Sequence, residues 1–349
     1  MDDPRRVAVP IDEESDVVAL LGCGISDAFG EFSERPVVVV RVHDRDQLTR
    51  VAALVSTLPC VTIAVAERAL PAAPGFDVYL CEESGPPAPW VGCPDGVHDQ
   101  THRIIDTVIA GPRASLVLCQ LLRFSVQLSV LDGLVAESLA YAALQGGREH
   151  RLWLERRGLR PVTPEPAPDD PPVLLERRGD ELTITLHRPD IHNAFSAAMR
   201  DSLVEGLRVA LVDPTITSIV LAGAGASFCS GGDLREFGTV GDPSLGHVVR
   251  TTRSPPYLLD QLASRCTARV HGACVGAGIE LAAFAGTVLA TADARFKLPE
   301  VGMGLIPGSG GTVSVPRRIG AARTAFLALA GTSLDAEEAA SWGLIDDIR

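Results

Sequence analysis

The stretch from Arg269 to Gly311 reads R-V-H-G-A-C-V-G-A-G-I-E-L at 269–281 and F-K-L-P-E-V-G-M-G-L-I-P-G-S-G-G at 296–311. Two acids in it, Glu280 and Glu300, stand among glycines and apolar residues. A carboxylate in such a setting costs free energy unless it is paired or has a chemical role. We therefore interpret this acid pair as the candidate chemical centre of the chain.

The first acid follows a glycine-rich junction between two predicted elements. A strand is predicted to end at Val275 and a helix to begin near Ala277, with small residues at 276–278 that allow a ligand close to the backbone. The free N–H groups and the dipole of a helix start favour developing negative charge, as in an oxyanion hole. Glu280 falls in the first turn. The alternative is a glycine-rich turn in which Glu280 only stabilises its own helix.

A second glycine-rich segment, F-C-S-G-G-D-L at 228–234, follows a predicted strand and is predicted to precede a helix. Its pair Gly231-Gly232 offers a second N–H group for the same oxyanion. The alternative is an ordinary loop between strand and helix.

The second acid follows Pro299, which fixes the backbone just before Glu300. Two carboxylates around one substrate can divide the handling of water and of a carbon-bound proton. The alternative is a surface glutamate in a loop. The segment I-P-G-S-G-G-T at 306–312 is predicted to open another helix. It is not a P-loop, because no Gly-Lys-Ser/Thr follows.

Composition narrows the classes of function. The chain has 349 residues, is 46% hydrophobic and carries a formal net charge of -13, which argues against nucleic-acid and anionic-membrane partners. It shows no signal-peptide pattern and no apolar run long enough to span a membrane. The eight cysteines form no C-x-x-C pair and no metal-ligand spacing, so we expect a reduced cytoplasmic protein without a bound metal.

Two modules are predicted along the chain. The first has buried strands and then a helical block, and the second alternates strands with helices, which indicates an α/β architecture. Six prolines in R-P-V-T-P-E-P-A-P-D-D-P-P at 160–172 predict an extended linker between them. In the first module we predict strands at 37–42, 61–66 and 76–81 and helices at 48–57, 101–144 (with breaks) and 149–157. In the second we predict a hairpin at 173–186, a helix at 196–212 with one apolar face (Met199, Leu203, Leu207 and Leu211), and strands at 219–221, 263–270 and 288–291.

Five segments of the second module resemble the crotonase superfamily of enoyl-CoA hydratases and isomerases, in family order. They are I-T-L-H-R-P-D-I-H-N-A-F (184–195), S-F-C-S-G-G-D-L (227–234), V-H-G-A-C-V-G-A-G-I-E-L (270–281), F-K-L-P-E-V-G-M-G-L-I-P-G-S-G-G (296–311) and A-S-W-G-L-I-D (340–346). The resemblance implies a repeated ββα-spiral fold that binds an acyl-CoA thioester. It also implies coenzyme A as part of the substrate, no other cofactor, and a homo-oligomer, trimeric or hexameric.

The resemblance also implies roles for particular residues. Catalysis falls to Glu280 and Glu300, and the oxyanion N–H groups to Gly232 and Ala277. Hydration of a trans-2-enoyl-CoA follows, because family hydratases have Glu at both acid positions and isomerases usually keep one. Glu280 would position and deprotonate water for attack at C3, and Glu300 would protonate C2. The implied substrate-binding residues are Arg188, Ala194, Gly232, Asp233, Leu234, Arg235 and Ala277. Phe195, Phe237 and Phe284 either line an acyl pocket or belong to the core.

The resemblance breaks near the end of the chain. Family members usually continue beyond W-G-L-I-D with several helices, whereas here a similar segment, with E-S-L-A-Y at 137–141 and W-L-E-R-R at 153–157, lies in the first module. We therefore predict a degenerate crotonase-like and helical module at 1–159, a linker at 160–173 and the catalytic domain at 174–349. Another reaction of the family (isomerase, hydrolase, dehydratase or lyase) and a non-catalytic CoA-binding or scaffolding role remain alternatives.

Overall fold

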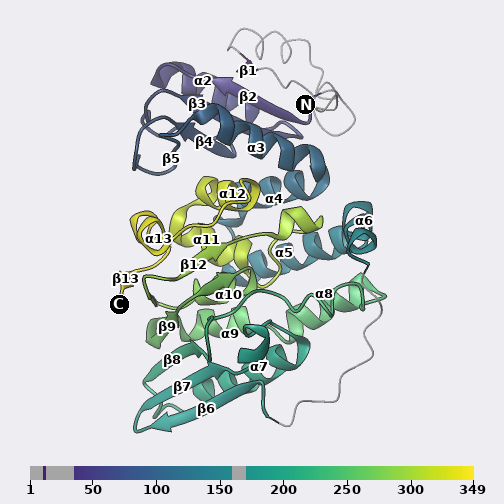
Figure 1. Ribbon diagram of the computed structural model, residues 1–349, viewed down its shortest axis with the longest axis vertical. Helices are drawn as coiled ribbons and strands as arrows, with labels where there is room; N and C mark the ends of the chain where they lie inside the picture. Colours follow the sequence, from purple (N-terminus) through teal and green to yellow (C-terminus); the bar gives the residue numbers. More distant parts are fainter. Residues whose placement is uncertain (1–10, 13–34, 159–169) are drawn as a thin grey trace. The chain divides into compact units, whose positions relative to one another are not determined.

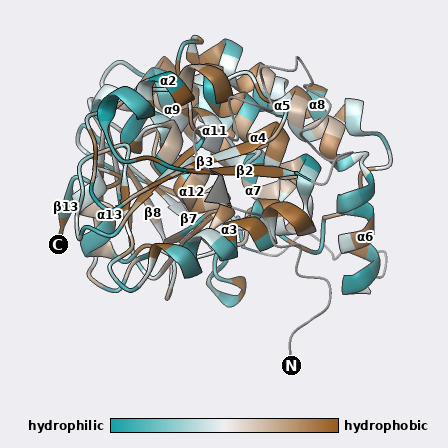
Figure 2. Ribbon diagram, turned by 90° about the horizontal axis from the view of Figure 1, so that it is seen from above, coloured by the Kyte–Doolittle hydropathy of each residue, from teal (hydrophilic) through white to brown (hydrophobic). Residues whose placement is uncertain are grey.

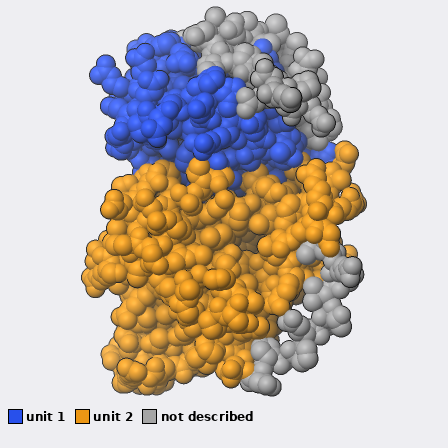
Figure 3. Space-filling model, viewed as in Figure 1, with its two compact units in different colours: residues 1–123, 320–330 blue, residues 124–319, 331–349 orange. Residues whose placement is uncertain are grey.

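The computed structural model describes residues 11–12, 35–158 and 170–349, which form two compact units (Figures 1 and 3). Unit 1 holds residues 1–123 and 320–330, and unit 2 holds residues 124–319 and 331–349. The predicted loose N-terminus and almost all of the proline-rich linker lie outside the described residues.

Unit 1 is built on a parallel sheet with the order β1-β2-β3-β4-β5. Its strands are β1 (Ile11–Asp12), β2 (Val37–Arg41), β3 (Val61–Ala66), β4 (Val78–Cys81) and β5 (Val91–Gly92), and its helices are α2 (Arg45–Val55), α3 (Val97–Ala110) and α12 (Ala321–Leu329), with α4 (Pro112–Ser125) at its boundary. Every residue of β3 is buried, as the run V-T-I-A-V-A predicts for a strand covered on both faces. Figure 2 shows β2 and β3 as hydrophobic. The three strands predicted in this region are confirmed.

An ion pair in unit 1 joins Arg123 of α4 to the buried Asp77, which directly precedes β4. Arg123 donates to both carboxylate oxygens of Asp77, at 2.8 Å each, and to the carbonyls of Leu58 and Cys60. Because the pair is bidentate and two further N–H groups of Arg123 bond backbone carbonyls, the charge of the buried Asp77 carboxylate is compensated. The resemblance of this module to a degenerate crotonase unit stays a prediction.

Unit 2 carries a six-stranded sheet with the order β13-β11-β9-β8-β7-β6, in which only the β6–β7 pair is antiparallel. The strands are β6 (Val173–Arg178), β7 (Glu181–Leu186), β8 (Ser218–Gly223), β9 (Cys266–Val270), β11 (Thr287–Ala290) and β13 (Asp347–Ile348). A second, two-stranded parallel sheet pairs β10 (Ala273–Val275) with β12 (Arg295–Lys297). The predicted hairpin at 173–186 and the predicted α/β architecture are confirmed.

Helices and short 3-10 turns of unit 2 connect these strands. The helices are α5 (Val130–Gln145), α6 (Arg148–Arg157), α7 (Ala197–Val212), α8 (Pro243–Thr252), α9 (Pro255–Leu262), α10 (Ala277–Ala282), α11 (Gly311–Ile319) and α13 (Ala336–Trp342), and the 3-10 turns are η2 (Pro189–Ile191), η3 (Ala263–Arg265) and η4 (Glu300–Met303). The Ser196 side chain caps α7 by accepting from the Met199 N–H. Met199, Leu203 and Leu207 are buried as predicted, whereas Leu211 is 40% exposed. Four-residue steps drift around a helix of 3.6 residues per turn, and the buried position of the last turn is Ala210 instead.

The helix predicted directly after Leu234 is wrong. Residues 234–238 form turns closed by bonds from the Glu236 N–H to the Asp233 carbonyl and from the Thr239 N–H to the Glu236 carbonyl, and the next helix is α8. The module boundaries at 159 and 174 stay a prediction, and the compact units divide the chain differently: α5 and α6 belong to unit 2, and α12 belongs to unit 1.

Within the described residues, no single helix is long and apolar enough to cross a membrane, although α3 and α4, which meet at a 110° bend, reach that length and composition together.

Candidate active site

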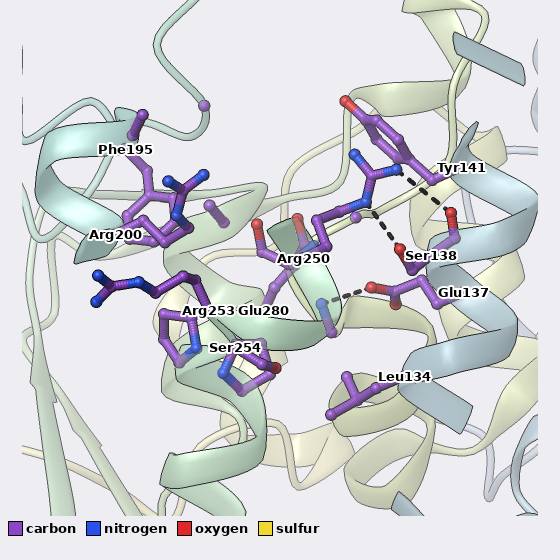
Figure 4. Close-up of a pocket in the computed structure, with 18 of the residues that line it drawn as sticks. Leu134, Glu137, Ser138, Tyr141, Phe195, Arg200, Arg250, Arg253, Ser254 and Glu280 are labelled. Atoms are coloured by element: carbon purple, nitrogen blue, oxygen red, sulfur yellow. Dashed lines mark hydrogen bonds between the residues drawn. The ribbon is translucent and has the colours of Figure 1, made fainter. Parts of the chain in front are cut away.

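A pocket of about 200 Å³ in unit 2 brings the two predicted acids and the two predicted oxyanion residues together (Figure 4). Glu280 and Glu300 line it, as do Gly232 and Ala277. The remaining walls come from α5, the start of α7, the loop after Gly232, α8, the start of α9 and the loop before α11. They include Leu134, Glu137, Ser138, Tyr141, Phe195, Arg200, Phe237, Arg250, Arg253, Pro256 and Ser309. The pocket therefore collects side chains from segments that are far apart in sequence.

The junction between β10 and α10 requires glycine for two reasons. Gly276 has φ 49° and ψ −121°, which side chains rarely tolerate, and its N–H donates to the Lys297 carbonyl. A Cβ atom at this position would lie 2.5 Å from the Oε1 atom of Glu300. The missing side chain thus lets the Glu300 carboxyl lie directly against the start of α10. The predicted close approach of a ligand to residues 276–278 stays a prediction.

The loop carrying Gly232 runs beside the same junction. Cys229 exchanges hydrogen bonds with Ala273 and Val275, and a Cβ atom at Gly231 would lie 3.2 Å from the Val275 carbonyl oxygen. In the hydrogen bonding of the described residues, neither the Gly232 N–H nor the Ala277 N–H donates to a protein oxygen. Two unused backbone donors at one pocket can stabilise negative charge on a bound carbonyl oxygen.

Asn193, to which the sequence reasoning assigned no role, fixes the segment that borders this loop. Its side chain is fully buried, its φ is 53°, and its Oδ1 atom accepts from the Arg188 N–H at 2.7 Å. Its Nδ2 atom lies within hydrogen-bond distance of the carbonyls of Ala224, Ser227 and Phe228. Asn tolerates the left-handed conformation better than most residues, so the H-N-A part of the motif has a structural explanation.

The predicted substrate-binding residues outside the pocket have internal partners. Asp233 forms an ion pair with Arg235 at 2.8 Å, and the Asp233 N–H donates to the Phe195 carbonyl. Arg188, Ala194, Asp233, Leu234 and Arg235 do not line the pocket. Their role in binding the CoA part stays a prediction. Of the three phenylalanines, Phe195 and Phe237 line the pocket, whereas Phe284 is a buried core residue that does not.

Glu280 is held by backbone amides at the start of α11. It is 2% exposed, and its Oε2 atom accepts from the N–H groups of Ser309 at 2.6 Å and Gly311 at 2.9 Å. Burial, followed by the charges of Glu300 and Glu137, raises the pKa of Glu280 well above its ordinary value. The two N–H bonds act in the opposite direction, because they favour the charged carboxylate.

Glu300 opens η4 and has a different environment. Its Oε2 atom is buried and has no hydrogen-bond partner among the described residues. Burial raises the pKa of Glu300 to about 8. Hydrogen bonding therefore favours the charged form of Glu280 more than that of Glu300, although burial raises the pKa of both acids.

A third acid, Glu137 of α5, was missed as a site residue. It is 2% exposed; its Oε1 atom accepts from the Gly310 N–H at 2.7 Å, and its Oε2 atom accepts from the Thr312 N–H at 2.9 Å and the Thr312 hydroxyl at 2.7 Å. Burial raises the pKa of Glu137 to about 7. Glu280 and Glu137 thus share four consecutive amides, 309 and 311 for one and 310 and 312 for the other. In the sequence, Glu137 stood out only as part of the E-S-L-A-Y segment, which resembles the family's C-terminal helices and did not indicate a role for this acid.

Helix α6, hydrophilic over much of its length in Figure 2, packs against η4 behind Glu300. The Nδ1 atom of His150 lies 3.0 Å from the Met303 carbonyl oxygen, and the Trp153 ring meets the Phe237 ring at a centroid distance of 5.9 Å. This packing supports the 3-10 turn that carries one acid and the aromatic ring beside Gly232. Among the described residues no group of three or more His, Cys, Asp or Glu could hold a metal ion.

Comparison with known proteins is consistent with this site. A family model described as enoyl-CoA hydratase/isomerase matches residues 179–349. The chain is 33% identical over 177 residues to 2,3-dehydroadipyl-CoA hydratase of Escherichia coli K12 (50% of this chain, 68% of that protein) and 39% identical over 168 residues to 1,2-epoxyphenylacetyl-CoA isomerase of the same organism (47% and 64%). A solved enoyl-CoA hydratase from Mycobacterium smegmatis aligns with 30% identity over 51% of this chain and 70% of that one, at a TM-score of 0.48.

Proposed function

The chain belongs to the enoyl-CoA hydratase/isomerase family, and from that premise we propose that it hydrates a trans-2-enoyl-CoA to the 3-hydroxyacyl-CoA. The chain spans about two thirds of the length of the curated hydratase and isomerase it matches, so the reaction is argued from its own residues. The observation that carries the proposal is that Glu280 and Glu300 line one pocket with two unused N–H donors.

In this reaction the thioester oxygen accepts from the N–H groups of Gly232 and Ala277. Glu280, as the carboxylate, takes a proton from water while the water oxygen bonds to C3. The C2–C3 π electrons move to the thioester oxygen as an enolate, and the two N–H groups stabilise that charge. The enolate collapses, C2 takes the proton of Glu300, and the two acids exchange one proton through solvent before the next turnover.

Support for these roles comes from the unequal surroundings of the two acids. Glu280 accepts two amide hydrogen bonds, which favour its charged form, whereas the Oε2 atom of Glu300 accepts none from the described residues. Paired acids whose environments separate their protonation states suit a reaction that needs one base and one acid. The 39% identity to 1,2-epoxyphenylacetyl-CoA isomerase keeps isomerisation as the second candidate.

The test is turnover of crotonyl-CoA and longer trans-2-enoyl-CoAs, with product identification by mass spectrometry in H₂¹⁸O. We expect ¹⁸O in a 3-hydroxyacyl product and a loss of about 10²- to 10⁴-fold in kcat for Glu280→Gln and for Glu300→Gln. Glu337→Gln, an exposed acid on α13, is the matched control and should retain wild-type turnover.

Two results would overturn the proposal. A shifted double bond without ¹⁸O incorporation would indicate an isomerase. No turnover of any enoyl-CoA, with CoA esters still bound, would indicate a non-catalytic homologue.

A further inference from the structure

Arg250 of α8 enters the pocket without a carboxylate partner. Its Nε atom donates to the Ser138 hydroxyl at 3.0 Å, its Nη2 atom donates to the Ser138 carbonyl at 3.3 Å, and its guanidinium lies 4.5 Å from the centre of the Tyr141 ring. Figure 4 shows the group between Tyr141 and Ser138, with both hydrogen bonds drawn. Three contacts therefore hold this half-buried cation in one orientation.

Most of the donor capacity of this guanidinium is unused. An arginine has five N–H donors, and the two bonds to Ser138 leave three. Among the described residues no carboxylate oxygen lies within ion-pair distance of Arg250, whereas the other two arginines of the pocket are paired, Arg200 with Asp201 and Arg253 with Glu205. Arg250 thus differs from Arg200 and Arg253 because it has no carboxylate partner among the described residues and three of its N–H donors are unused.

Glu137 is the carboxylate whose charge acts on Arg250, but it forms no ion pair with the Arg250 guanidinium. Both oxygens of Glu137 are already occupied by donors from Gly310 and Thr312. Burial, which removes water from the guanidinium, lowers the pKa of Arg250. A half-buried guanidinium with free donors is best compensated by a planar anion that accepts two of them, and a carboxylate has that geometry.

The position of Arg250 indicates which part of a ligand would supply this anion. Figure 4 shows Phe195 on one side of the pocket and the Arg250 guanidinium on the other, beside Ser138 and Tyr141 of α5. A thioester held by the two oxyanion donors would extend its acyl chain past Glu280 and Glu300 toward the α5–α8 side. Gly246 lets the Arg250 side chain lie close to the α8 backbone, because a Cβ atom at that position would lie 3.2 Å from the Nη1 atom of Arg250.

We propose that the substrate is an enoyl-CoA whose acyl chain ends in a carboxylate, and that Arg250 binds that carboxylate and so determines specificity. This inference rests on the proposed acyl-CoA function of the same pocket. Ser138 and Tyr141 orient the guanidinium, and the substrate replaces the missing ion-pair partner.

The experiment compares two CoA esters that differ only at the far end of the acyl chain. Adipyl-CoA and hexanoyl-CoA have six acyl carbons, cannot be hydrated, and share the same CoA part, so their calorimetric Kd values isolate the terminal carboxylate. We expect the wild-type protein to bind adipyl-CoA about 10- to 100-fold more tightly, since a hydrogen-bonded charge pair supplies that much. Arg250→Met should reduce the preference to about twofold or less. Arg208→Met, an exposed arginine of α7 outside the pocket, should leave it unchanged.

Several outcomes would overturn the inference. Equal or weaker binding of adipyl-CoA by the wild-type protein would do so without any variant, as would no binding of either ester. A folded Arg250→Met protein that loses affinity for both esters equally would place Arg250 at a CoA phosphate instead. Turnover of hex-2-enedioyl-CoA and hex-2-enoyl-CoA separates the two proposals. Hydration of both substrates at equal kcat/KM would support the proposed hydration and contradict recognition of a terminal carboxylate. A preference for adipyl-CoA in binding, without turnover of either enoyl-CoA, would support carboxylate recognition by Arg250 and contradict hydration.

Discussion

Replacing Glu137 by glutamine changes one buried acceptor and leaves its shape almost unchanged. The carboxylate accepts three hydrogen bonds, from the Gly310 N–H, the Thr312 N–H and the Thr312 hydroxyl. The amide of glutamine has one acceptor oxygen, and its NH₂ group must then face a donor. Whichever way the amide turns, at least one buried N–H group at the start of α11 loses its partner.

The size of the loss follows from these bonds. A hydrogen bond to a charged group contributes about 1.5–3 kcal/mol, and an unsatisfied buried donor costs about 1–3 kcal/mol. We therefore expect Glu137→Gln to lower the local opening free energy of segment 309–312 by about 2 kcal/mol, which is about a 30-fold change in the opening equilibrium. The kcat for hydration should also fall by about tenfold or more, because Ser309 and Gly311, which hold Glu280, lie on the same segment.

Amide hydrogen exchange followed by mass spectrometry measures this directly. A peptide covering 305–315 should exchange about 30-fold faster in Glu137→Gln than in the wild-type protein under conditions of fast reclosing. The matched control is Asp335→Asn, the same acid-to-amide change at an exposed helix cap that accepts one N–H bond. Asparagine caps about as well as aspartate, so the control peptide should not change. Exchange of 305–315 within threefold of wild type in Glu137→Gln would refute the reasoning, since the bonds would then contribute less than about 0.7 kcal/mol.

Two further predictions concern Glu300 and the glycine beside it. Burial raises the pKa of Glu300 to about 8, so the folded protein binds this proton more tightly than the unfolded chain, and the contribution of Glu300 to stability falls as pH rises from about 4.5 to 8. Glu300→Gln should flatten the decline of the unfolding midpoint over that range, and parallel pH profiles for the two proteins would contradict the assignment. Gly276→Ala should lower kcat by about 10²-fold or more, because the new methyl group would meet Glu300 and the residue has positive φ. Gly302→Ala, where a Cβ would meet nothing within 4 Å, is the control, and equal losses in both variants would argue against a specific contact.

Sequence patterns predicted the elements whose signals are local. The apolar run of β3, the turn at Gly179 between β6 and β7, and the Ser196 cap of α7 each depend on residues within one element or its immediate neighbours. The glycines around Glu280 were informative for the same reason, because a close approach or positive φ excludes a side chain whatever surrounds it.

The failure after Leu234 shows where local patterns stop. Asp233 resembles a helix cap, but its carboxylate pairs with Arg235, and Glu236 accepts from the Ala197 N–H at the start of α7. These contacts stabilise turns in the segment in place of a helix. Gly238, with φ 81°, has a conformation that is also incompatible with a right-handed helix. The partner on α7 lies 39 positions away, so no window of sequence around Asp233 contains the reason.

Glu137 could not be identified as a pocket residue from the sequence around it, because its hydrogen-bond partners are Gly310 and Thr312, which lie far along the chain. The start of α11 presents unpaired amides, as every helix start does, and here two carboxylates from different helices divide them in alternation. Burial raises the pKa of both acids, and the charges of Glu300 and Glu137 raise that of Glu280 further, whereas the amide hydrogen bonds lower the pKa of both. The charge available on Glu280 is therefore set jointly by α11 and by the acid beside it. It follows that Glu137 of α5, although it precedes the proline-rich segment and the matched family region, acts electrostatically on Glu280 in the pocket.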